Sequence, residues 1–501
     1  MVQTDISPIT LNSLKVTNNT TAVLYASTAT TMTLSSSNVA NPALDIDAGS
    51  TLRDSTTAGV LFQTNFAANA RAEVDGDFRV GANPALGTTT DVGVFANASG
   101  LIFNVNSGGR LIFGARGFTF GTTTTLIFNA GSFMVLDRDA GSSPIAQYNP
   151  SSTTQIVGNV TTASSLFGGG ANPTVGNVEY NSPNLNPGAN LPTMTLQINT
   201  VIQGNFRILN TNNKKITLLS NSASGAPAPL NVTVQGNFEV SGPSIVTVSG
   251  PLSDPGRDFN LTVNGNYIQS AGTVSLQDFD GITHPTKLSI KGNIVQTGGN
   301  LTVGSNATNA SANLFIVELS GSSNQNVSFS SGTIDNSNAQ VALRMNNAAG
   351  ATLLTPLSVG RMDFVSGVLT TAVATPLTIN NTSTSAFVIN GVSDASYVSG
   401  PVKRRTNLAD AYAFPTGKGG NFRIIELIPS TTTLSEFTAE YFNTNHPDPD
   451  VSLPLTGRST VEYWNVTRSF GTDAAVRLTL EGAVPGASPS DGIVVARYNG
   501  S

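Results

Sequence analysis

Four side chains that could do chemistry together lie in one short segment, LQDFDGITHPTKL at 276–288. Asp278, Asp280, His284 and Lys287 supply two carboxylates, a base and a cation within ten residues. Carboxylates paired with such groups serve general acid–base chemistry on glycosidic bonds. Clustered oxygens of this kind also suit a hard cation such as Ca²⁺. The plainer interpretation is a long corner loop in which the aspartates cap turns.

A second candidate site is basic. Lys403, Arg404 and Arg405 are consecutive and could bind an anionic glycan or lipopolysaccharide. A solvated strand face carries runs of the same kind, so the segment does not by itself predict a ligand. Tyr463 and Trp464 could stack on sugar rings, but packing in a core is the simpler role for them.

Other reaction types lack the residues they need. The chain has no cysteine, which excludes thiol nucleophiles and thiolate-held metals, and its two histidines are 162 residues apart, which argues against a histidine-based zinc site. Neither a Gly-x-Ser-x-Gly motif nor a phosphate-binding loop is present. We therefore expect no catalytic residues and no cofactor, with Ca²⁺ the only metal considered.

Composition indicates many thin strands. Only 11% of the 501 residues are charged, 39% are hydrophobic and the net charge is −6. Uncharged polar residues interleaved with Val, Ile, Leu and Phe are typical of β-strands rather than of a disordered chain. The mild acidity argues against nucleic-acid binding. No apolar run of about 18 residues is present, so we expect no membrane span.

A repeated phrase predicts how these strands are arranged. VTVQGNFEV, LTVNGNYIQ and LSIKGNIVQ align on a Gly-Asn pair, and the same pair follows Ile202. The aligned residues are Gly204, Gly236, Gly265 and Gly292, followed by Asn205, Asn237, Asn266 and Asn293. Repeats of about 30 residues without helical periodicity predict a parallel β-helix, in which each coil stacks on the last. We expect positive φ at the glycines, αL-tolerant asparagines and a ladder of mutual side-chain amide hydrogen bonds.

Changes in composition suggest the domain boundaries. We expect a cap or lead-in over 1–20, a parallel β-helix stalk over 21–385 and a smaller antiparallel β-sandwich module over 386–501. The segment 150–195 is rich in turn residues and is expected to be irregular. We expect the last module to be truncated at Ser501.

The C-terminal module resembles one found in large, repetitive cell-surface proteins of Bacteroidetes-type bacteria. The matching phrases are YVSGPVKR at 397–404, FPTG at 414–417, Tyr463-Trp464 and VARY at 495–498. The preceding Gly-Asn repeats are similar to the β-helical stretches of that family. The resemblance implies type IX secretion and a role as a cell-adhesion protein or surface filament, and it carries over no catalytic residue.

The expected function is therefore structural. We expect a secreted or outer-membrane-associated adhesin or extracellular filament component that binds surface glycans or other copies of itself, with a homo-oligomer or filament as its assembled form. The alternative is a carbohydrate-active or carbohydrate-binding β-helix protein of the polysaccharide lyase or glycosidase kind. Two carboxylates converging within about 5–10 Å in a cleft would favour the alternative.

Overall fold

The structure is a computed structural model of the 501-residue chain. It describes residues 2–3, 8–25, 28–54, 62–80, 92–114, 117–121, 124–139, 143–161, 174–187, 194, 196, 199–219, 229–249, 258–277, 284–303, 315–334, 341–387, 389, 391–448, 450, 458–478 and 495. Asp278 and Asp280 lie outside these residues. Two compact units divide the chain, one of Met1–Gly265 with Ala271–Val274 and one of Asn266–Ser270 with Ser275–Ser501.

The described residues form an all-β structure whose sheets are mainly parallel, as the repeats predicted. A 3₁₀ turn at Thr384–Ala386 is the one helical element among them. Strands are short and alternate between buried and partly exposed residues, as in β5 (Thr30–Leu34). Within each unit a strand pairs mostly with the strand three places along the chain, so the chain completes a coil of about three strands before it returns to the same sheet.

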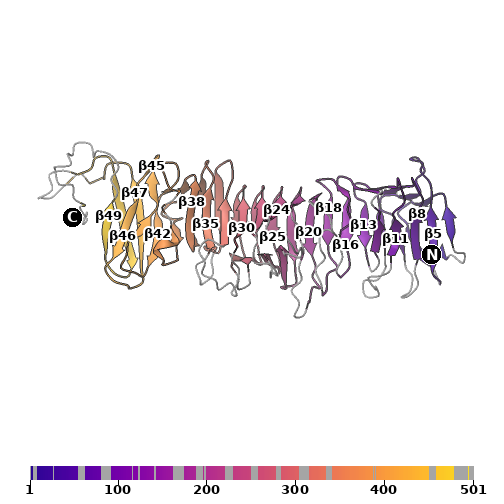
Figure 1. The fold of residues 1–501 in the computed structure, drawn as a ribbon, viewed down its shortest axis with the longest axis horizontal. Helices are drawn as coiled ribbons and strands as arrows, with labels where there is room; N and C mark the ends of the chain where they lie inside the picture. The colour runs from indigo at the N-terminus through magenta and orange to yellow at the C-terminus, as the bar shows by residue number, and fades with distance from the viewer. Residues whose placement is uncertain are drawn as a thin grey trace. The chain divides into compact units, whose positions relative to one another are not determined.

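In the first unit, three parallel sheets run through the first repeats (Figure 1). One sheet contains β1 (Val2–Gln3), β4 (Thr21–Tyr25), β7 (Thr51–Asp54), β10 (Asp77–Val80), β13 (Arg110–Phe113), β16 (Phe133–Leu136), β18 (Thr153–Ile156), β20 (Asn177–Asn181), β22 (Phe206–Asn210) and β25 (Phe238–Val240). A second contains β2 (Ile9–Leu11), β5, β8 (Phe62–Phe66), β11 (Val92–Ala96) and β14 (Gly117–Phe120). A third contains β3 (Leu14–Val16), β6 (Leu44–Ile46), β9 (Arg71–Val74), β12 (Ile102–Val105), β15 (Thr125–Phe128) and β17 (Gln147–Tyr148).

Two further parallel sets begin later in the same unit. They are β19 (Thr174–Val175), β21 (Thr200–Ile202), β24 (Leu230–Val234) and β27 (Phe259–Val263), and the pair β23 (Lys215–Leu219) and β26 (Ile245–Ser249). The next strand, β29 (Thr273–Gln277), contains residues of both units. The region 150–195 thus includes ordered strands, β18 and β20, that pair in register.

The second unit begins with parallel strands and ends with antiparallel ones. One parallel set contains β28 (Tyr267–Gln269), β31 (Ile294–Gln296), β34 (Gln325–Phe329), β36 (Ala351–Leu353), β39 (Leu369–Thr370), β41 (Val398–Ser399) and β44 (Thr416–Lys418). A second contains β30 (Thr286–Ile290), β33 (Phe315–Leu319), β35 (Val341–Asn346) and β38 (Arg361–Ser366). A third contains β37 (Leu357–Val359), β40 (Leu377–Ile379) and β42 (Val402–Thr406). Its remaining strand in this part is β32 (Asn300–Thr302).

Antiparallel pairing starts at β42. That strand pairs in parallel with β40 on one side and antiparallel with β47 on the other. The antiparallel strands are β45 (Asn421–Phe422), which pairs with β44; β47 (Ser435–Phe442) and β48 (Tyr463–Phe470); and β43 (Tyr412–Phe414), β46 (Ile425–Pro429) and β49 (Ala474–Leu478). The change of pairing therefore occurs at β42 and β44, each of which has one parallel and one antiparallel neighbour.

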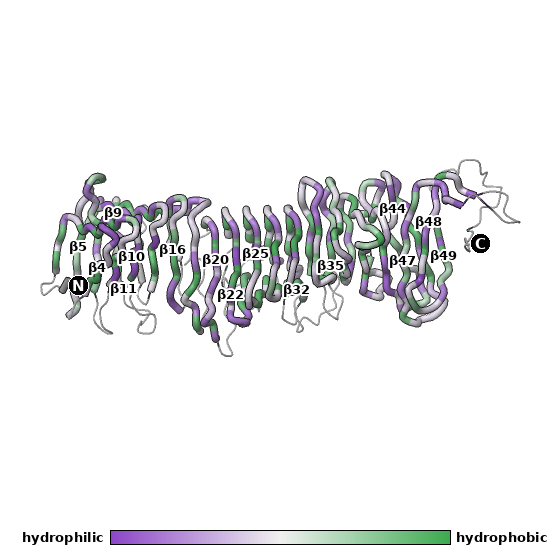
Figure 2. Tube along the Cα trace, turned by 180° about the vertical axis from the view of Figure 1, so that it is seen from behind, coloured by the Kyte–Doolittle hydropathy of each residue, from purple (hydrophilic) through white to green (hydrophobic). Residues whose placement is uncertain are grey.

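The aligned apolar positions of the repeats form the core. All eight residues two places before and two places after the glycines are buried, with 0% exposure: Ile202, Val234, Val263, Ile290, Phe206, Phe238, Tyr267 and Ile294. Equivalent aromatic rings stack between coils, as for Phe206 and Phe238, whose centroids are 5.2 Å apart. Figure 2 shows hydrophobic and hydrophilic residues interleaved along the coils of each unit, because each strand turns one face inward and one outward.

Among the described residues, no helix is long and apolar enough to cross a membrane.

Candidate functional site: the asparagine ladder and the charged outer faces

The asparagines of neighbouring repeats meet within each unit and form a ladder. In the first unit, Asn177 Oδ1 accepts from the backbone N–H of Asn205, and Asn205 Oδ1 accepts from that of Asn237, each at 2.8 Å. In the second unit, Asn266 Oδ1 accepts from the N–H of Asn293 at 2.7 Å, and Asn293 Oδ1 from that of Asn326 at 2.8 Å. Each of these bonds, the rungs of the ladder, joins a side chain to a backbone, so the prediction of bonds between side-chain amides is wrong.

The side chain takes the place of a backbone carbonyl in these rungs. The carbonyl of Asn205 accepts from the N–H of Val178 at 2.8 Å, and that of Asn237 accepts from the N–H of Phe206 at 2.8 Å. Both main-chain groups of Asn205 and Asn237 are therefore bonded to the preceding coil. Bonds between neighbouring coils therefore continue through the corner, where the backbone N–H and C=O groups would otherwise be left unpaired.

The prediction of positive φ at the aligned glycines is wrong. None of Gly204, Gly236, Gly265 and Gly292 has a left-handed backbone. What these corners require is the absence of a side chain, because a Cβ on Gly204 would lie 2.2 Å from Asn177 Oδ1 and one on Gly236 would lie 2.4 Å from Asn205 Oδ1. A Cβ on Gly265 would lie 2.5 Å from the Gly236 carbonyl oxygen.

Left-handed residues occur at a different corner of the same repeats. Gly242, Gly272 and Gly299 have φ of 59°, 75° and 75°, and Asn212 and Asn213 have φ of 54° in the preceding repeat. Glycine is used at the first corner for close approach and at the second for backbone conformation.

Two asparagines of the ladder, Asn177 and Asn326, were not predicted from the sequence. Asn177 follows Gly176, so the Gly-Asn pair was present there as a signal, but it lies in the segment expected to be irregular. A Cβ on Gly176 would lie 2.2 Å from the carbonyl oxygen of Ser152, which repeats the close approach seen at Gly204. Asn326 follows Gln325, so the pair is absent and only the coil spacing could have found it.

The predicted acid–base loop contributes one residue to a charged array on the second unit. Lys287 Nζ lies 3.7 Å from Oε1 of Glu318, whose side chain is only 8% exposed. Arg344 stands between two acids, 3.9 Å from Glu318 Oε2 and 3.2 Å from Asp363 Oδ2. Ser289 Oγ also donates to Glu318 at 2.8 Å. The array lies on the outer face of β30, β33, β35 and β38, and sequence reasoning missed all of it except Lys287.

His284 precedes this array and is partly buried in the segment leading into β30. In the part of the chain that the structure describes, no group of three or more acidic or histidine side chains is placed to hold a metal ion.

The basic run at 403–405 does not form one exposed patch. Arg404 is completely buried, because strand alternation turns it inward while Lys403 and Arg405 face the other way. Its guanidinium donates to the carbonyls of Ser383 at 2.9 Å and Thr384 at 2.6 Å, as well as to that of Ala413. Burial lowers the pKa of Arg404 to about 10. Arg404 thus ties its own strand to two other backbone segments, at 383–384 and at Ala413.

Arg405 lies on the opposite face from Arg404 and is paired, with its Nε 3.4 Å from Glu436 Oε2. Of the three basic residues, only Lys403 and Arg405 remain available to an anionic ligand.

The predicted sugar-stacking pair has other aromatic partners. Tyr463 stacks on Phe442 with centroids 4.6 Å apart, and Lys418 covers the Phe442 ring at 4.7 Å. Trp464 contacts Tyr441 with centroids 5.3 Å apart. These contacts agree with a packing role for both residues.

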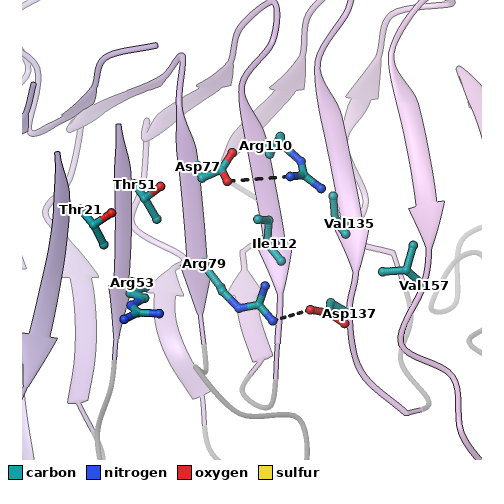
Figure 3. A pocket seen from close by; sticks show the side chains of 10 residues that line it. All are labelled: Thr21, Thr51, Arg53, Asp77, Arg79, Arg110, Ile112, Val135, Asp137 and Val157. Atoms are coloured by element: carbon teal, nitrogen blue, oxygen red, sulfur yellow. Dashed lines mark hydrogen bonds and ion pairs between the residues drawn. The ribbon is translucent and has the colours of Figure 1, made fainter. Parts of the chain in front are cut away.

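A shallow cavity of about 390 Å³ lies on the outer face of the first sheet of the first unit (Figure 3). Arg79 extends past Ile112 to an ion pair with Asp137, two strands away. Arg110 lies 3.8 Å from Asp77 on the adjacent strand. Arg53 is exposed and stands in register with Arg79.

This chain matches no family model, and searches of curated proteins and of solved structures likewise give no match.

Proposed function

We propose that this chain is a structural, adhesive protein of the cell surface or extracellular space. In this proposal its repeats form a parallel β-helix that serves as a stalk, and its C-terminal antiparallel strands form a β-sandwich module. The observation that carries the proposal is the asparagine ladder, in which the side chain of one coil bonds the backbone of the next. A stack of backbone bonds that continues through its corners suits a protein that bears load rather than one that moves.

The core supports the same role. Apolar residues of successive coils are fully buried at equivalent positions, so each coil is stabilised by its neighbours and little by itself. Opening one coil in the middle would break bonds on two sides. Adhesion would then come from many weak contacts along repeated faces, which together bind far more tightly than one contact does.

Mechanical resistance tests the structural part of the proposal. The chain has no cysteine, so Thr10→Cys and Gln235→Cys provide two unique, exposed attachment points within the first unit. Pulled between them, the unit should extend in abrupt events at forces above those of an all-helical domain in the same tether. Smooth extension at forces no higher than the helical domain's would overturn the load-bearing role.

Location and adhesion need their own test. Antibody against the chain should label intact cells of its source as strongly as permeabilised cells, and beads coated with it should attach to those cells or to each other. Labelling that requires permeabilisation would contradict the surface location.

A carbohydrate-active enzyme is the second candidate, favoured by the two acids on either side of Arg344. Against it, the array is internally paired and Glu318 is almost buried. A panel of polysaccharides incubated with the chain should give neither reducing ends nor unsaturated sugars. Product release that disappears in Glu318→Gln would replace the structural proposal with an enzymatic one.

A further inference from the structure

We infer that the cavity of Figure 3 binds an acidic polysaccharide, through an arginine cluster of Arg53, Arg79 and Arg110. This inference deepens the proposed adhesive function and rests on it. The shared ligand chemistry is a carboxylate or sulfate anion carried at intervals along a glycan chain.

The lining of the cavity carries an excess of positive charge. The cavity is lined by three arginines against two aspartates, in a chain whose net charge is −6. A local positive excess on an otherwise acidic protein attracts anions to this face. Guanidinium groups bind carboxylate and sulfate oxygens through two parallel hydrogen bonds, which makes arginine well suited to such ligands.

The register of β7 and β10 places two of the arginines side by side. Arg53 and Arg79 stand directly opposite each other on β7 and β10, where like charges are destabilising. Arg79 is drawn away to Asp137, whereas Arg53 is exposed and no ion pair to it is found within the described residues. An anion between the two guanidiniums would neutralise the repulsion that the register creates.

The charged residues of the cavity lie in rows that run across the strands. Asp77 and Arg110 form one row across the strands, and Arg53, Arg79 and Ile112 form the next. Since neighbouring strands are about 4.8 Å apart, the cluster extends roughly 10 Å perpendicular to the strands. An extended glycan lying across the coils can therefore present successive anionic groups to it. Farther along the same row the charges alternate and are paired, since Glu179 lies 3.4 Å from Arg207 on the next strand, so among the described residues the unpaired arginine of this row lies in the early coils.

Binding to immobilised polysaccharides tests the inference. Polygalacturonate supplies carboxylates, dextran sulfate supplies sulfates, and dextran is the neutral control; the first two arms identify which anion is preferred. The chain should bind at least one acidic polymer, with affinity that falls as salt rises, and should not bind dextran. Equal retention on dextran, or stronger retention on double-stranded DNA than on either acidic polymer, would overturn the inference.

Variants localise the binding. Arg53→Gln should weaken binding by about tenfold, the value of one charge-assisted contact. Asp137→Asn should strengthen it, because it releases Arg79 to the ligand. Lys291→Gln removes an exposed positive charge from the second unit and should leave binding unchanged. Unchanged binding in Arg53→Gln, or weaker binding in Asp137→Asn with its melting temperature preserved, would place the ligand elsewhere.

The two proposals fail separately. Loss of acidic-glycan binding with mechanical resistance intact would remove this site and leave the load-bearing role in place.

Discussion

The side-chain Oδ1 of Asn205 accepts a hydrogen bond from the backbone N–H of Asn237, 32 residues later in the sequence, at 2.8 Å. Asn205 is itself held in the same way by Asn177. Asn205 therefore has two structural roles: its side chain accepts a bond from one neighbouring coil and its backbone donates one to the other, as Asn293 does in the second unit. Substitutions at these positions test whether the ladder stabilises the fold.

Asn205→Ala removes the acceptor and leaves the N–H of Asn237 without its partner. We expect the free energy of unfolding to fall by about 1–3 kcal/mol, the cost of a part-buried polar group left unpaired. Urea denaturation measures the change. Asn231→Ala is the matched control, because the Asn231 side chain accepts an exposed bond from Asn260, at 2.9 Å, whose loss should cost about 0.5 kcal/mol or less. Equal losses in both variants would contradict a special role for the ladder.

Gly236→Ala tests the close approach of coils. The new Cβ would lie 2.4 Å from Asn205 Oδ1, so the corner must shift, and we expect a loss of about 1–3 kcal/mol. Gly108 offers the contrast, since its φ is 82° and nothing lies within 4 Å of its Cβ position.

Substitution by asparagine distinguishes a glycine that is needed for its left-handed backbone from one that is needed for close packing. Asn tolerates a left-handed backbone, so Gly108→Asn should be nearly neutral, whereas Gly236→Asn should destabilise at least as much as Gly236→Ala. Thermal unfolding of the three variants gives the comparison. A stable Gly236→Asn protein would show that the corner has room after all.

Arg404→Ala should be among the most damaging substitutions in the second unit. It leaves the carbonyls of Ser383, Thr384 and Ala413 without their donor and opens a cavity, so we expect a loss of about 3 kcal/mol or more. Lys403→Ala, on the opposite face of the same strand, should cost about 0.5 kcal/mol or less. A mild Arg404→Ala phenotype would indicate that water replaces the guanidinium.

Alkaline pH should destabilise the protein. Burial raises the pKa of Tyr148, Tyr180, Tyr267 and Tyr441, so the folded state keeps protons that the unfolded state releases near pH 10. The stability that these groups contribute is complete below pH 10 and is lost as pH rises further. Arg404 acts in the opposite sense, because its pKa is lowered to about 10 and the folded state loses that proton first.

Burial also lowers the pKa of Arg138, Lys215 and Arg361, which act in the same sense as Arg404 but with smaller shifts. The four tyrosines have the larger shifts, so the net slope should be negative. Urea unfolding at pH 8, 9.5 and 11 measures it, and Tyr267→Phe should make the decline shallower. A free energy of unfolding that stays constant or rises above pH 10 would contradict this balance.

The repeats were sufficient to predict the parallel strands and their core. Alignment on the Gly-Asn pair placed apolar residues two positions away on either side, and every one of them is buried. Alternation within a strand could also have placed Arg404 inside, since Val402 and Thr406 are buried beside it on the same face. The charges of residues 403–405 alone do not reveal this, because charge does not tell which face of the strand each residue occupies.

Other features could not be deduced from residue type. A glycine is compatible with positive φ and with close packing alike, and only the distance from Gly236 to Asn205 Oδ1 distinguishes them. The array of Glu318, Arg344 and Asp363 brings together residues 19 to 45 positions apart that no local motif connects. Long-range register decides such contacts, and it follows from the number of residues in each intervening turn.

The ladder contact is the same whether 28 residues separate the two asparagines, as for Asn177 and Asn205, or 32, as for Asn205 and Asn237. The chain between two rungs can thus lengthen or shorten while the corner stays in place. Such a design lets genetic insertions, deletions and whole-repeat duplications accumulate outside the corners, so the sequence there can diversify without a new fold having to evolve.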